Sequence, residues 1–131
     1  MRSKTIANPV VHFEIMGKEA ARLRKFYTEA FGWQIAPPMA GSPSQYSIVE
    51  KANAGSAGSI GGGIGVAPDG YDGHVTFYVY VDDVAATLDR LERLGGQKMM
   101  GPDQVPGGPI IGLFKDPEGH VVGLVHDPDQ N

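Results

Sequence analysis

The sequence predicts an α+β fold in which two βαβββ modules follow one another along the chain. The chain repeats its own pattern at a shift of 64 residues, so that His12–Trp33 aligns without a gap with Thr76–Gln97. Each copy begins with alternating apolar residues, changes to helical spacing, reaches a glycine and continues as shorter strand-like runs. Three such runs follow the second helix. A domain with the element order βαββαβ would have only one strand after its second helix. We expect a curved mixed sheet, with the helices on its outer face and a cavity on its inner face.

Composition limits the classes of protein and partner. The 131 residues suffice for a single domain, 1–131, with a core of its own. The 11 basic and 15 acidic residues give a net charge of −4 and form no basic stretch, so nucleic acid is not an expected partner. The lack of cysteine excludes disulfides, thiolate nucleophiles and thiolate metal sites. No apolar run reaches the ~20 residues that span a bilayer or resembles a signal peptide. We therefore expect a cytoplasmic protein without a membrane partner.

The first module, at about 8–66, opens with an alternating strand, Val10–Met16. Helical spacing follows over Lys18–Phe31, and Gly32 suits the left-handed position just past a helix end. The inward stripe of this helix is expected to contain Ala20, Leu23, Tyr27 and Ala30, widened by Phe26 and Phe31.

The remainder of the first module is less regular. Short strands are predicted at Trp33–Ala36 and Tyr46–Glu50, on either side of the loop Pro37–Ser44. The glycine-rich stretch Ala52–Gly65 is consistent with a flexible loop that leads into a strand around Ile60–Val66. Its GGGIG run lacks the Lys-Ser/Thr and the helix that follow a phosphate-binding loop, so it does not predict a nucleotide site.

The second module, at about 73–127, repeats the pattern more clearly. His74–Val81 alternates as a strand, and Asp82 or Asp83 caps the helix that follows. The expected inward residues of this helix are Val84, Leu88, Leu91 and Leu94, and Gly95 ends it. Three further strands are predicted at Gln97–Met100, Ile110–Lys115 and His120–His126, with a tight turn at Asp116–Gly119 between the last two.

The alternation assigns the functional face. In both first strands the large apolar residues point the same way as the helix stripes and should pack beneath the helices. The opposite face then carries a polar and aromatic set, which we take as the candidate ligand-binding residues: His12, Glu14, His74, Thr76, Tyr78 and Tyr80. If the sheet curls, these side chains line a cavity; if it stays open, they form a solvated or dimerising surface.

The order and spacing of several short motifs resemble the vicinal oxygen chelate superfamily, in the form of a single-domain, glyoxalase-like member. That superfamily includes glyoxalase I, extradiol dioxygenases, fosfomycin-resistance enzymes and bleomycin-binding proteins. The motifs that carry the resemblance are His12 fourteen residues before Phe26-Tyr27, then Phe31-Gly32-Trp33, Val81-Asp82-Asp83-Val84, Leu94-Gly95-Gly96 and Asp116-Pro117-Glu118-Gly119. The resemblance implies the fold, but the motifs are not specific for one activity.

Metalloenzymes of this superfamily hold one divalent metal with His or Glu side chains from the first and last strands of each module. In this chain, the metal-ligand position on the first strand of the first module is His12. The equivalent position of the second module is Thr76, and His74 lies two residues earlier on the same strand face. The metal-ligand position on the last strand of the second module is Gly123. The matching stretch of the first module, Ser59–Gly63, contains no carboxylate. The candidate metal ligands are therefore His12 and His74. With Glu14 added, such a set would suit zinc, nickel, manganese or iron.

Three functions follow as alternatives. The leading one is a metal-free pocket that binds a small organic molecule, because this needs only shape, aromatic walls and a few polar anchors. The second is a divalent-metal-dependent glyoxalase-like lyase, isomerase or dioxygenase that uses His12 with Glu14 or His74, and Glu14 is its candidate catalytic residue. The third is a module that mainly dimerises. A nucleophilic enzyme is not expected, and His120 and His126 are interpreted as structural or surface residues. The resemblance also implies a homodimer.

Overall fold

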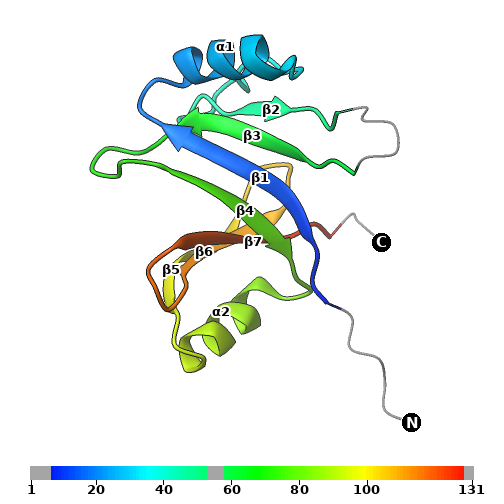
Figure 1. Ribbon diagram of the computed structural model, residues 1–131. Coiled ribbons are helices and arrows are strands. Elements are labelled where there is room, and N and C mark those ends of the chain that lie inside the picture. The colour runs from blue at the N-terminus through cyan, green and yellow to red at the C-terminus, as the bar shows by residue number, and fades with distance from the viewer. Residues whose placement is uncertain (1–6, 53–57, 129–131) are drawn as a thin grey trace. The chain divides into compact units, whose positions relative to one another are not determined.

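A computed structural model describes residues 7–52 and 58–128. The chain divides into two compact units. The N-terminal unit is His12–Phe77, and the C-terminal unit is Tyr78–Asn131 together with Met1–Val11. In the described residues, two helices and seven strands of a mixed sheet are present, which confirms the predicted α+β class. Each unit contains one of the helices (Figure 1).

The N-terminal unit holds most of β1 (Val10–Gly17), all of α1 (Ala20–Phe31), β2 (Ser47–Val49) and β3 (Gly61–Val66), and the first half of β4 (His74–Tyr80). Its strands follow the order β2-β3-β1-β4. β3 runs parallel to β1 and antiparallel to β2. Helix α1 packs against β3 and ends at Gly32, whose left-handed backbone is the predicted one.

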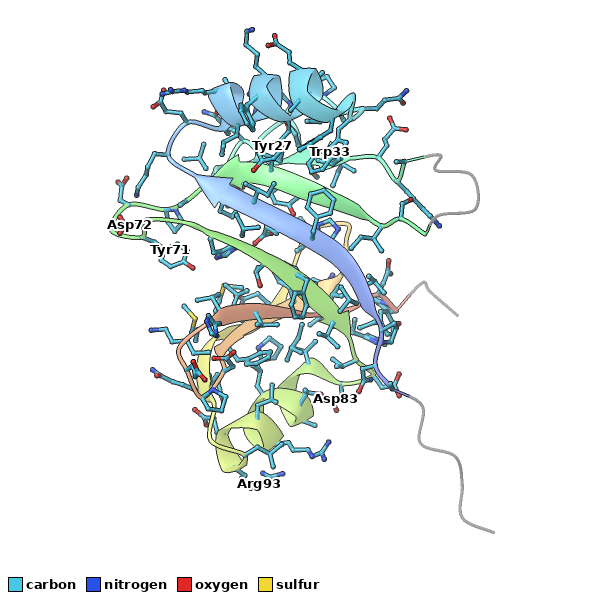
Figure 2. The ribbon with its side chains drawn as sticks, viewed as in Figure 1. Tyr27, Trp33, Tyr71, Asp72, Asp83 and Arg93 are labelled. Atoms are coloured by element: carbon cyan, nitrogen blue, oxygen red, sulfur yellow. The ribbon has the colours of Figure 1, made fainter. Side chains whose placement is uncertain are left out.

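The apolar face of the N-terminal unit forms its core under α1. Ile15, Val49 and Ile64 are buried, and five partly buried residues pack against them: Phe13, Leu23, Tyr27, Trp33 and Ile35. Figure 2 shows Tyr27 on α1 and Trp33 between that helix and the strands. Their rings stack with centroids 5.1 Å apart. The predicted inward position of Phe13 and Ile15 is confirmed.

The C-terminal unit contains α2 (Val84–Arg93), β5 (Gln97–Gln104), β6 (Ile110–Lys115) and β7 (Val121–His126), besides the second half of β4. β7 is parallel to β4 and antiparallel to β6, which pairs in turn with β5. Of the two predicted caps, Asp83 is the one used: its carboxylate accepts a hydrogen bond from the Ala86 backbone N–H at 2.9 Å. Its core is formed by Val81, Val84, Leu88 and Leu124.

The structure corrects several sequence predictions in detail. Trp33–Ala36 forms only an isolated bridge, Ile35 to Val49, because the prolines at 37 and 38 lack the N–H groups that would extend the pairing. β5 continues beyond Met100 to Gln104 with irregular pairing. Gly61–Val66 is a strand, as predicted.

The buried stripes of the helices are narrower than predicted. Phe26 and Phe31 are 59% and 64% exposed, so the prediction that they widen the inward stripe of α1 is wrong. Leu23 and Tyr27, one helical turn apart, already cover the strands, and Phe26 leans edge-on against Tyr27. Leu94 is also exposed, because α2 ends at Arg93 and Leu94 is only its C-cap residue.

Two surface hollows border α1, one beside Ile35–Pro37 and the other beside Gly17–Glu19. Neither is lined by a residue of the predicted polar face. The cavity expected on the inner face of the sheet therefore stays a prediction. Within residues 7–52 and 58–128, neither helix is long and apolar enough to cross a membrane.

Candidate functional site

The candidate site begins with the register of β1 on β3. His12 pairs with Gly61 and Glu14 pairs with Gly63, so both polar side chains stand beside glycines on the same face of the strands. The apolar residue between them, Phe13, points to the α1 side. Because Gly61, Gly63 and Gly65 have no side chains, this face of β3 leaves room for another segment of the chain.

Tyr46 fills that room. A Cβ atom at Gly63 would overlap the Tyr46 ring, and one at Gly65 would lie 3.0 Å from it. The backbone before Tyr46 is turned by Gln45, a non-glycine residue with a positive φ of 51°. The Tyr46 N–H donates to the Ser42 hydroxyl at 3.2 Å, which holds this turn together. The glycines of β3 and the turn at Gln45 thus place one phenol ring on the polar face of β1.

Glu14 lies at the centre of a buried hydrogen-bond network in the N-terminal unit. It is only 7% exposed. The Tyr46 hydroxyl donates to its Oε1 atom at 2.9 Å, and the Nε2 atom of His74 lies 2.7 Å from its Oε2 atom. The Nε2 atom of His12 lies 2.8 Å from the Tyr46 hydroxyl oxygen. Three of the predicted site residues, His12, Glu14 and His74, are therefore brought together, with Tyr46 as the link between the first two.

The acceptor character of the Glu14 carboxylate fixes the direction of these bonds. A carboxylate can only accept, so Nε2 of His74 carries the hydrogen of its bond to Glu14. The hydrogen of the Tyr46 hydroxyl points to Glu14, so Nε2 of His12 must donate to the phenol oxygen. Both histidines therefore present an Nε2–H group toward the centre of the network.

A second tyrosine extends the network at His74. Tyr71 lies on the loop between β3 and β4 (Figure 2), and its hydroxyl is 2.7 Å from Nδ1 of His74. The Lys18 ammonium donates to the Tyr71 carbonyl at 2.5 Å. Gly73, with a φ of 109°, passes so close to the Met16 carbonyl that a side chain there would clash. These contacts fix the loop and hold Tyr71 against His74.

Burial changes two pKa values in this network. Burial lowers the pKa of His12 below its ordinary value, although the neighbouring Glu14 carboxylate acts in the opposite direction. Burial and the charge of Glu14 both raise the pKa of the Tyr71 hydroxyl. His12 is thereby favoured as a neutral imidazole and Tyr71 as a neutral phenol.

The other predicted site residues have the following contacts. Thr76 is buried on β4, and its hydroxyl lies 3.5 Å from the Phe77 carbonyl. Tyr78 and Tyr80 belong to the C-terminal unit, where Tyr78 packs over Gly123 and the Tyr80 hydroxyl donates to the Asp127 carbonyl at 3.2 Å. Their predicted role as ligand-binding residues stays a prediction.

The two remaining histidines make local contacts in the C-terminal unit. Nδ1 of His120 lies 2.9 Å from the Asp116 carboxylate within the tight turn. Nδ1 of His126 lies 3.0 Å from the Val81 carbonyl at the end of β7. These contacts fit the structural interpretation of both residues.

The candidate metal ligands do not fit a divalent cation in this arrangement. A metal needs the lone pair of an imidazole nitrogen, but Nε2 of both His12 and His74 carries a hydrogen directed at another side chain. No group of three His, Asp or Glu residues in the described part of the chain is placed to hold a metal ion. At Gly123, the empty last-strand position, any side chain would overlap the Tyr78 ring.

Sequence reasoning missed Tyr46 and Tyr71 as members of the site. A signal for Tyr46 was present in the alternate glycines of GGGIG, since a strand without side chains on one face requires a covering group from elsewhere. Which aromatic residue provides it depends on the turn at Gln45, which periodicity does not reveal. For Tyr71 the sequence offers only its nearness to His74.

Comparison with known proteins places the chain in a family. The family model of the Glyoxalase/Bleomycin resistance protein/Dioxygenase superfamily matches residues 10–124. The chain belongs to this superfamily. A "Glyoxylase-like domain-containing protein" of Didymella fabae is 26% identical over 102 residues, which are 78% of each chain. The resemblance stated from the sequence motifs is confirmed.

Solved structures of the superfamily share the fold at low sequence identity. A Streptomyces coelicolor methylmalonyl-CoA epimerase variant in complex with 2-nitronate-propionyl-CoA has a TM-score of 0.67 and 15% identity, over 93% of this chain and 96% of that one. A superfamily member from Vibrio splendidus 12B01 has a TM-score of 0.61 and 12% identity, over 92% and 100%. At these identities the likeness concerns the fold alone.

Proposed function

We propose that this superfamily member binds a small organic molecule, without the help of a metal, on the polar face of the N-terminal unit. The observation that carries the proposal is the buried Glu14 carboxylate, which receives hydrogen bonds from Tyr46 and His74. Pockets for small molecules combine aromatic walls with a few fixed polar groups, and this face supplies both. His12, Glu14, His74 and Thr76 are the proposed binding residues, and Tyr46 joins them as a wall.

The comparisons support a small ligand, although they do not identify it. Among the solved structures, one methylmalonyl-CoA epimerase carries methylmalonyl-CoA and another carries 2-nitronate-propionyl-CoA. Both are organic molecules bound by proteins of the same fold. Whether this chain accepts an acyl-CoA is part of the test and not of the proposal.

The competing function is a divalent-metal-dependent lyase, isomerase or dioxygenase that uses His12 with Glu14 or His74. Glu14 is the proton acceptor in that alternative. The network disfavours it, because the atoms that would ligate the metal already serve as hydrogen-bond partners to Tyr46 and to each other.

The test is a binding screen with chelator-treated protein. A panel of small aromatic compounds, carbonyl compounds and acyl-CoA thioesters is added, and the melting temperature and ligand NMR signals are followed. A ligand at a hundred times its Kd adds about 2.7 kcal/mol to the stability, which a melt resolves. Glu14→Gln should abolish binding, because its amide places an N–H₂ group against one of the two donors that face the carboxylate.

Glu50→Gln is the matched control, since Glu50 is an exposed carboxylate of the same unit. Far-UV circular dichroism checks that both variants fold. Ligand binding that survives in Glu14→Gln would contradict the proposed site. Binding that requires added metal would instead support the metalloenzyme.

A further inference from the structure

The Tyr46 hydroxyl contacts the residue at a metal-ligand position that the superfamily resemblance implies. The hydroxyl oxygen lies 2.8 Å from Nε2 of His12 and 2.9 Å from Oε1 of Glu14, and so it bridges the two. His12 stands at the first metal-ligand position that the superfamily resemblance implies. We propose that the Tyr46 hydroxyl takes the place of a metal ion at Nε2 of His12 and links this residue to Glu14, so that this site recognises its ligand by hydrogen bonds. The proposal rests on the proposed function.

The two kinds of link make opposite demands on His12. A metal ion accepts the lone pair of the imidazole nitrogen, whereas the phenol oxygen accepts its hydrogen. One nitrogen cannot satisfy both, so the tautomer with Nε2–H that Tyr46 selects is unable to ligate through that atom. The Glu14 carboxylate is compatible with either link, because it acts as an acceptor in both.

The backbone holds Tyr46 in this place. Its ring lies over Gly63 and Gly65, where a Cβ would leave no room for it. Its centroid is 6.4 Å from that of His12 with the ring planes 20° apart, so the two rings lie nearly parallel. The turn at Ser42–Gln45 is tied to the end of β3 by the bond from the Val66 N–H to the Ser44 carbonyl, at 2.7 Å. The phenol is therefore a built part of the site.

The C-terminal unit offers a comparable packing arrangement. Its last-strand ligand position is Gly123, and the Tyr78 ring lies where a side chain at that position would extend. In each unit a tyrosine ring lies over a strand glycine.

The proposal also limits the class of ligand. A metal would favour molecules with two adjacent oxygens that chelate it, such as hydroxamates and catechols. A phenol, a carboxylate and imidazole N–H groups favour a molecule with its own hydrogen-bond donors and acceptors, and chelating oxygens bring no advantage there.

The experiment compares divalent-metal binding by wild type and two Tyr46 variants. Zn²⁺, Ni²⁺ and Mn²⁺ are titrated into metal-free protein, and bound metal is counted per chain after dialysis. Wild type should hold no stoichiometric metal. Tyr46→Ala removes the phenol and frees Nε2 of His12 and Oε1 of Glu14, so it should bind Zn²⁺ or Ni²⁺ more tightly than wild type, within the weak range that so few ligands allow. The gain should disappear when His12→Ala is added.

Tyr46→Phe separates the two effects of Tyr46. It removes the hydroxyl that selects the Nε2–H tautomer of His12 but keeps the ring over Gly63 and Gly65, so its gain of metal should be smaller than that of Tyr46→Ala. If Tyr46→Ala fails to fold, Tyr46→His takes its place, because it removes the phenol and adds an imidazole nitrogen to His12 and Glu14, so it should gain metal.

Two results would overturn the inference. One is a wild-type protein that binds one metal per chain and loses it in His12→Ala. The other is a folded Tyr46→Ala or Tyr46→His variant that gains no metal. Both can be told apart from a failure of the proposed function, because the metal titration needs no organic ligand. A ligand found in the screen would stand even if Tyr46→Ala gained no metal.

Discussion

At the scale of single residues, the site depends on how one buried carboxylate is satisfied. Glu14 is accompanied in its network by a phenol and an imidazole, both of which donate to it. Removing one member of such a network leaves a buried partner without its bond, which costs about 1–3 kcal/mol. The network therefore fixes both the conformation of Glu14 and the tautomers of its neighbours.

The lowered pKa of His12 predicts a pH dependence of stability. In the folded protein His12 binds a proton less readily than in the unfolded chain, where its pKa is near 6.5. As the pH falls below 6.5, protons bind preferentially to the unfolded chain and stability decreases. His12→Gln should make this decrease shallower, which urea unfolding midpoints between pH 8 and pH 5 would measure.

His120→Gln is the control with the opposite sign. Hydrogen bonding to Asp116 raises the pKa of His120, so this residue contributes stability at low pH that is lost as the pH rises. Its removal should make the decrease at low pH steeper. An unchanged slope in His12→Gln would contradict the lowered pKa of the partly buried His12 imidazole.

At the scale of elements, β3 shows why a glycine-rich segment can be a strand. Phe13 packs over Gly62 on the α1 side, and Tyr46 packs over Gly63 and Gly65 on the other. Rings from neighbouring segments cover both faces of β3. They fill the space that side chains of β3 itself would otherwise occupy. The GGGIG run therefore provides space for aromatic residues.

Gly63→Ala tests this interpretation. The added methyl group would overlap the Tyr46 ring and force it from its place, so we expect a loss of about 1–3 kcal/mol in unfolding free energy. Gly58→Ala is the control, because a Cβ there meets no atom within 4 Å, and its stability should stay close to wild type. Urea denaturation measures both. Equal stability of the two variants would show that Tyr46 does not lie on β3.

At the scale of the whole molecule, the superfamily assignment and the repeated pattern agree. Each of the two units packs one helix on strands of its own, although the boundary between the units lies within β4 and not between the two sequence repeats. Several large apolar side chains remain exposed on the chain, among them Phe26, Phe31, Val75 and Leu94. Single exposed apolar residues are normal on protein surfaces, so the expected homodimer rests on the superfamily resemblance alone.

We therefore retain the prediction that the protein is a homodimer. Light scattering coupled to size-exclusion chromatography should give twice the chain mass of 13.9 kDa. Dilution into the nanomolar range and sedimentation analysis would then give the dissociation constant. A species of single-chain mass at micromolar concentration would contradict the dimer.

The sequence by itself determined the α+β class, both helices, the superfamily and, apart from their exact ends, seven of the eight strands that it predicted. The class and the elements follow from periodicity and glycine placement, which are local properties of the chain, and the superfamily follows from the order and spacing of short motifs. It also placed His12, Glu14 and His74 on one face, since alternation decides which residues share a face of a strand. Only the tertiary structure decided what these residues do together. The bridge from His12 to Glu14 depends on Tyr46, 32 residues after Glu14, and on the turn and glycines that hold its ring. Contacts so distant in sequence leave no periodic trace, because they arise from strand pairing and packing.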